Sequence, residues 1–99
     1  MSLKYEFSEN HELIITVGDS FGFIDHKSFF EIIKQITHNI SSIILDFQRT
    51  TFIDYSALGM ILILRDLTIE QQKKLNVINL QPEIKFLLKA VELDKILNI

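Results

Sequence analysis

The residues from Phe52 to Leu64, FIDYSALGMILIL, place an acid, an aromatic ring and a hydroxyl directly before a long apolar run. Apolar character persists from Ala57 to Leu67, which is longer than a typical strand of about 5 to 6 residues. We therefore predict a largely buried helix from Ser56 to about Glu70, with Ser56 as its N-cap.

Ser56 has two interpretations that its position alone leaves open. As an N-cap, its hydroxyl would bond a free amide of the first turn and contribute about 1 kcal/mol. The same place is the positive end of a helix dipole, and it would also accommodate a phosphoryl group on the serine. Asp54, two residues earlier, would then lie beside a new charge of about −1.5 to −2.

Catalysis is disfavoured by the surrounding residues. The GxSxG motif of serine hydrolases needs glycines on both sides of the serine, and Asp54 and Leu58 occupy those positions. A receiver domain phosphorylated on Asp46 would need a paired acid cluster to hold magnesium, and the sequence offers none. A small enzyme that pairs Asp46 with Asp54 would lack a third metal ligand. We expect no enzyme activity, metal or cofactor.

The composition predicts one compact domain spanning residues 1–99. Hydrophobic residues make up 47% of the chain, with 3 Gly and 1 Pro, which is too apolar for a disordered segment. The chain has no Cys, which excludes disulfides and thiolate metal sites. The net charge is −3 and the lysines are scattered, which disfavours nucleic-acid binding.

The N-terminal residues lack the pattern of a secretory signal, and no apolar stretch approaches the roughly 20 residues of a membrane span. We therefore expect a cytoplasmic protein without membrane insertion. The oligomeric state is not determined by these observations.

The hydrophobic periodicity predicts seven elements in the order β-β-α-β-α-β-α. Helices interleaved with strands indicate an α/β fold, with a mixed, mostly parallel sheet and helices packed on it. The predicted elements are strands at 4–8 and 11–17 forming a hairpin, a helix at 26–40 capped by Asp25, a strand at 42–47, the helix at 56–70, a strand at 74–80 and a helix from Pro82 to Val91.

The predicted loop from Gly18 to Ile24 carries two phenylalanines, Phe21 and Phe23. They could fold back onto the core, which is the commoner fate of Phe. If exposed, they would form with Tyr55 an aromatic patch of the kind enriched at protein interfaces. The sequence leaves these two outcomes open.

The run SIILDFQRTTFIDYSALGMILILRD resembles the corresponding region of STAS domains, the bacterial anti-sigma factor antagonists. In that family an aspartate-bearing strand is followed by a second strand end, an aspartate, a phosphorylatable serine or threonine, and a small residue before Leu and Gly. The resemblance extends from the N-terminal hairpin through NLQPEI to the ending LDKILNI, and so covers most of the chain.

The resemblance implies a partner-switching protein phosphorylated on Ser56. Its partner would be an anti-sigma factor that is itself a serine kinase, and a cognate phosphatase would reverse the modification. The partner-binding face implied for this chain comprises Asp25, Asp54, Tyr55, Ala57 and Gly59, together with Phe21 and Phe23 if they are exposed.

Two residues depart from the family pattern, which usually has a small hydroxyl residue where this chain has Tyr55 and often Gly where it has Ala57. Tyr55 could obstruct a kinase loop or anchor a particular partner. Two alternatives lie within the same family: a subunit that braces a lipid-transport ABC complex, and a scaffold of stress or chemosensory assemblies.

Overall fold

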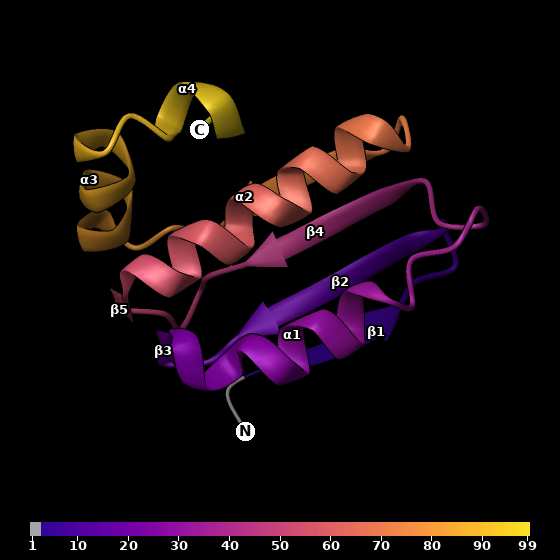
Figure 1. Ribbon diagram of the computed structural model, residues 1–99, viewed down its shortest axis with the longest axis horizontal. Coiled ribbons are helices and arrows are strands. Elements are labelled where there is room, and N and C mark those ends of the chain that lie inside the picture. The colour runs from indigo at the N-terminus through magenta and orange to yellow at the C-terminus, as the bar shows by residue number, and fades with distance from the viewer. Residues whose placement is uncertain (1–2) are drawn as a thin grey trace.

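The computed structural model describes residues 3–99 and shows the expected alternation of strands and helices (Figure 1). The elements are β1 (Leu3–Phe7), β2 (Glu12–Val17), β3 (Ser20–Phe21), a 3₁₀ turn η1 (Phe23–Asp25), α1 (His26–Ile33), β4 (Ser42–Asp46), β5 (Phe52–Ile53), α2 (Tyr55–Glu70), β6 (Lys74–Ile78), α3 (Pro82–Ala90) and α4 (Asp94–Leu97).

The main sheet has four strands in the order β1-β2-β4-β6. The β1–β2 hairpin is antiparallel, whereas β2 pairs with β4, and β4 with β6, in parallel. The prediction of an α/β fold with a mixed, mostly parallel sheet is therefore confirmed. β4 lies in the interior of the sheet, and Ile43 and Leu45 on it are fully buried, as its continuous apolar sequence predicts.

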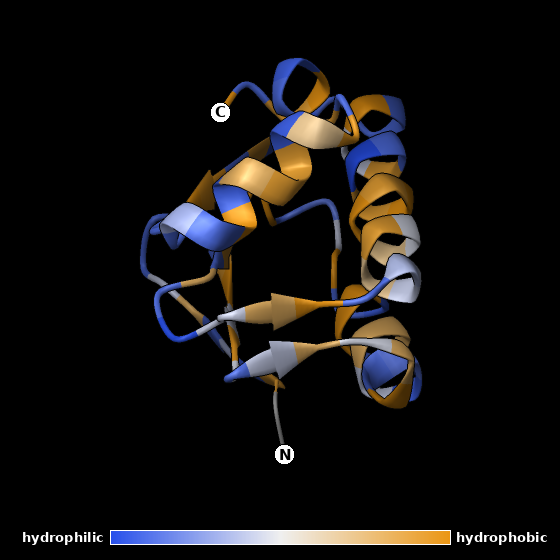
Figure 2. Cartoon of the chain, turned by 90° about the vertical axis from the view of Figure 1, so that its left-hand side faces the viewer, coloured by the Kyte–Doolittle hydropathy of each residue, from blue (hydrophilic) through white to orange (hydrophobic). Residues whose placement is uncertain are grey.

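The helices α1 and α2 lie side by side over one face of this sheet (Figure 1). Strand residues that alternate toward this face, such as Leu13, Ile15 and Val17, are fully buried. Phe29 of α1 and Ile61 of α2 complete the same core. α2 is hydrophobic over most of its length, as Figure 2 shows, because it packs against both the sheet and its neighbouring helices.

A second, two-stranded sheet joins the predicted loop from Gly18 to Ile24 to the residues directly before Asp54. Ser20 pairs with Phe52 and Phe21 with Ile53 in the parallel β3–β5 ribbon. The hydroxyl of Thr50 donates a 2.7 Å hydrogen bond to the carbonyl of Gly18 next to it. The ribbon lies just beyond the carboxyl ends of β2 and β4, and it holds the turn after β3 beside the start of α2.

One predicted helix ends early, and the C-terminal residues form an additional helix. α1 stops at Ile33 rather than at residue 40, because the chain must cross from the helix layer to the sheet before β4 begins at Ser42. Ile40 lies outside the helix and is nevertheless buried. Residues Asp94–Leu97 form the short helix α4, which contacts β6, and Leu97 and the N-cap residue Leu93 are buried.

No helix within residues 3–99 is long and apolar enough to cross a membrane.

Candidate functional site

The carboxylate of Asp54 caps the N-terminus of α2. Its Oδ1 accepts a 2.9 Å hydrogen bond from the backbone N–H of Ala57, and the helix begins at Tyr55. The prediction that Ser56 is the N-cap is therefore wrong. An Asp is an equally good cap, and the extended backbone of residue 54 directs its side chain at the free amides. Ser56 therefore does not cap the helix.

The same carboxylate joins α2 to the turn that follows β3. Asp54 Oδ2 accepts a 3.1 Å hydrogen bond from the N–H of Phe23, and Asp25 Oδ2 accepts a 3.0 Å bond from the N–H of Gly22. A Cβ atom on Gly22 would stand only 2.5 Å from Asp54 Oδ2. The absence of a side chain at Gly22 therefore permits this connection between residues 31 positions apart in the chain.

These hydrogen bonds control the charge of the cap. The N–H of Ala57, followed by that of Phe23, lowers the pKa of Asp54 below its ordinary value of 3.8. Asp54 is therefore ionised at neutral pH, and its carboxylate already accepts hydrogen bonds from backbone N–H groups at the N-terminus of α2. A phosphoryl group on Ser56 would therefore lie near this negative charge, and Asp54 would already be the acceptor for the N–H groups that could otherwise bind the phosphate.

Ser56 and its neighbours lie on the surface. Ser56 is exposed in the first turn of the 16-residue helix α2, and Gly59 is exposed one turn later on the same side. A Cβ atom on Gly59 would meet nothing within 4 Å. The side chain of Tyr55 is 84% exposed, so it does not contribute to the core. These three residues are available to a partner.

Three residues of the expected partner-binding face are not available in this way. Phe21 and Ala57 are fully buried, and Asp25 is 6% exposed. Phe21 faces inward because β3 pairs with β5, and its ring packs against Phe29 with centroids 5.7 Å apart. Phe21 therefore packs in the core, which is one of the two outcomes that the sequence left open, and the buried side chain of Ala57, contrary to expectation, does not reach the partner-binding face. Asp25 instead shapes the turn through its bond to Gly22.

Four large apolar side chains lie around Asp54, two residues before Ser56, and form what we call the apolar rim: Phe23, Ile24, Phe52 and Tyr55. Their exposed fractions are 62%, 88%, 61% and 84% respectively. Phe23 stacks on His26 with ring centroids 4.6 Å apart, which orients it without burying it. Sequence reasoning identified Phe23 and Tyr55 but missed Ile24 and Phe52, whose exposure depends on the β3–β5 pairing.

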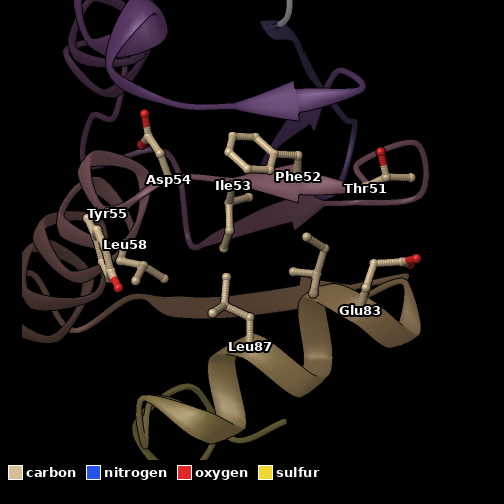
Figure 3. A pocket seen from close by; sticks show the side chains of 9 residues that line it. Thr51, Phe52, Ile53, Asp54, Tyr55, Leu58, Glu83 and Leu87 are labelled. Atoms are coloured by element: carbon tan, nitrogen blue, oxygen red, sulfur yellow. The ribbon is translucent and has the colours of Figure 1, made fainter.

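A groove of about 370 Å³ opens beside the rim, between β5, the start of α2 and α3. Figure 3 shows Ile53 and Leu58 directed into it across from Leu87, while the Asp54 carboxylate points away toward the β3 side. Phe52 and Asp54 line a second hollow of about 190 Å³ with the residues around Gly22. Asp54 therefore lines both hollows.

The described residues contain no group of three or more His, Cys, Asp or Glu side chains that could hold a metal ion. The site consists of one exposed hydroxyl, one ionised cap and an apolar rim. Exposed apolar side chains gathered in this way are a common feature of protein interfaces.

The fold is a small α/β domain with a four-stranded mixed sheet and an exposed first turn of α2 beside the apolar rim. The STAS domain model matches residues 2–99, and the chain belongs to the STAS domain family. A STAS-domain containing protein of Pseudomonas aeruginosa (strain UCBPP-PA14) is 26% identical over 92 residues, which cover 93% of this chain and 91% of that protein.

Solved structures share the same fold. A candidate anti-sigma factor antagonist of Thermotoga maritima, tm1081, has a TM-score of 0.83 and 15% identity, covering 96% of this chain and 82% of its own. The anti-sigma factor antagonist SpoIIAA of Bacillus, in its unphosphorylated form, has a TM-score of 0.71 and 17% identity, covering 98% and 97%. The fold also occurs within larger chains, since this chain spans 20% of the Mglu structure at a TM-score of 0.70.

Proposed function

We propose that this protein is an anti-sigma factor antagonist that switches partners according to the phosphorylation of Ser56. Its partner is an anti-sigma factor that is also a serine kinase, and a cognate phosphatase restores the unmodified form. The protein itself performs no catalysis. The observation that carries the proposal is the exposed hydroxyl of Ser56, which has no structural duty because Asp54 caps the helix.

The fold similarity to SpoIIAA supports this proposal, since SpoIIAA is an anti-sigma factor antagonist known in phosphorylated and unphosphorylated forms. Here the unmodified surface docks through the apolar rim and the adjoining groove. The rim supplies the aromatic anchors that dominate many interfaces, and the groove accepts an apolar side chain of the partner. Ser56 is exposed in the first turn of α2, directly after Tyr55 of the rim, and becomes enclosed on docking.

Phosphorylation turns this enclosed position into a source of repulsion. The phosphate adds a charge of about −1.5 to −2, and Asp54 already places one negative charge at the same helix end. Burying a charge without a partner costs several kcal/mol, and each 1.4 kcal/mol corresponds to about tenfold in affinity. A phosphate on Ser56 would thus weaken docking by roughly a thousandfold without a change of fold.

Affinity measurements with Ser56 variants test the proposal. We expect Ser56→Ala to bind the kinase partner like the wild type and to resist phosphorylation, and Ser56→Asp to bind at least about tenfold more weakly. Gln35→Glu is the matched control, because it adds one negative charge at an exposed position after α1. Isothermal titration calorimetry gives the affinities, and circular dichroism confirms that each variant is folded.

Equal binding by Ser56→Ala and Ser56→Asp, with both variants folded, would refute the switch. Peptide mapping of the protein isolated from its native cells supplies an independent check. We expect phosphate on Ser56 under the condition in which the partner holds its sigma factor.

A further inference from the structure

The β1 strand forms an open edge of the main sheet. It is the end strand in the order β1-β2-β4-β6, and all five of its residues pair with β2 in one unbroken register. Edge strands are commonly protected by a proline, a bulge or a covering element, and β1 carries neither a proline nor a bulge. Tyr5 and Phe7 are 46% and 49% exposed on it.

The hydrogen-bonding groups at this edge can be assigned from the register. Ser8 donates a 2.9 Å hydrogen bond to the carbonyl of Glu12, so the pair 8–12 is a bonded one. Because bonded and non-bonded pairs alternate in an antiparallel ladder, Lys4 and Glu6 also bond β2. The N–H and C=O groups of Leu3, Tyr5 and Phe7 therefore point outward from the sheet.

We infer that β1 pairs with β1 of a second copy of this chain in antiparallel orientation, which joins the two sheets into one. A two-fold axis at Tyr5 places Tyr5 opposite the same residue of the other copy, and Leu3 opposite Phe7. The outward groups of all three residues then meet as bonded pairs. Because of the two-fold symmetry, each copy contributes the same β1 residues to the interface.

The charges on the opposite face of β1 select this register. With Tyr5 on the axis, Lys4 of each copy stands opposite Glu6 of the other, as a non-bonded pair in which side chains are closest. A shift of one copy by two residues in either direction would place Lys4 opposite Lys4 or Glu6 opposite Glu6. The sequence LKYEF is thus self-complementary in one register and repulsive in the two neighbouring registers that preserve hydrogen bonding.

A groove next to β1 receives the aromatic side chains. It has a volume of about 580 Å³ and lies between β1 and α1, lined by Leu3, Tyr5, Lys27, Ser28, Glu31 and Ile32 among others. Odd-numbered residues of β1 face the helix layer, as the burial of Leu3 shows. Phe7 of one copy stands opposite Leu3 of the other on this side, and the ring covers the mouth of that copy's groove.

Charge-reversal variants test the pairing by sedimentation velocity over a range of protein concentrations. We expect a reversible dimer for the wild type, and Lys4→Glu or Glu6→Lys alone to weaken it at least about tenfold, because both cross-strand pairs become like-charged. The two single variants mixed together should form a heterodimer, and the double variant should regain the homodimer. Lys89→Glu and Glu70→Lys are the controls, since they make the same charge changes at exposed positions elsewhere.

A second pair of measurements tests the backbone contact. Tyr5→Pro removes an outward N–H without breaking the bonds to β2, so it should yield a folded monomer. In the wild type, amide exchange at Leu3, Tyr5 and Phe7 should slow as the protein concentration rises. A chain that stays monomeric at every concentration, or a dimer indifferent to the Lys4 and Glu6 variants, would overturn the inference.

Discussion

Replacing Gly22 by alanine tests whether the Asp54 carboxylate holds the turn after β3 against the start of α2. The added methyl group would stand 2.5 Å from Oδ2 and 2.9 Å from Cγ of Asp54. Ordinary contact begins near 3.4 Å, so this oxygen must retreat by about 0.9 Å. That movement stretches its 3.1 Å bond to Phe23 N–H beyond hydrogen-bonding range.

The expected cost follows from this overlap. Adding a methyl group where no space exists destabilises a protein by about 1–3 kcal/mol. For a chain of this length each 1 kcal/mol corresponds to about 4–8 °C, so we expect the Tm of Gly22→Ala to fall by roughly 5–20 °C. The backbone of Gly22 is extended, with φ near −162°, so the loss cannot come from a conformation that alanine avoids.

A double-mutant cycle that combines Gly22→Ala with Asp54→Ala tests whether the carboxylate causes the loss of stability. In an Asp54→Ala background the methyl group of Gly22→Ala no longer meets a carboxylate, and the substitution should become nearly neutral. Gly59→Ala is the matched control, because its methyl group meets nothing and it removes a glycine from a helix, which should stabilise by up to about 1 kcal/mol. Thermal unfolding by circular dichroism gives all five values. An equal loss of Tm on Gly22→Ala in both backgrounds would refute the proposed close approach.

Two further predictions concern the same end of α2. Because backbone N–H groups lower the pKa of Asp54 in the folded state, its stabilising contribution is fully present above the ordinary value of 3.8 and is lost as the pH falls through the lowered value. The difference in Tm between wild type and Asp54→Asn should therefore shrink under acid; a constant difference down to the acid transition would contradict the assignment. Tyr55→Ser should leave Tm within a few degrees of wild type, because the side chain is 84% exposed, and should change partner affinity or the rate of Ser56 phosphorylation. If neither property changes, Tyr55 is not part of the docking surface.

The order and type of the seven main elements could be predicted from the sequence because they depend on local periodicity. Alternating apolar residues marked β2, the continuous run SIILD marked β4, and the long apolar stretch after Ser56 marked α2. Their burial follows directly from these patterns. The position of Ser56 in the first turn of a buried helix was predicted on the same grounds, and only its role as the cap was wrong.

The roles of residues around Ser56 depend on contacts between distant segments, which periodicity does not encode. Asp54 and Ser56 are both good caps, and the choice between them was decided by the extended backbone of residue 54 and the turn at Gly22. Phe21 and Phe23 are only two positions apart in the sequence, yet Phe21 is fully buried and Phe23 is 62% exposed. The pairing of β3 with β5 separates them, since Phe21 is held within the ribbon and Phe23 lies in the turn after it.

The sequence alone therefore determined the order and type of the seven main elements, and that a hydroxyl follows an acid where α2 begins. Only the tertiary structure decided which of the two caps the helix and which aromatic rings reach the surface. The physical reason is that a hydrogen bond across 31 residues and a ribbon of two-residue strands stabilise the protein only after the main sheet has brought their segments together.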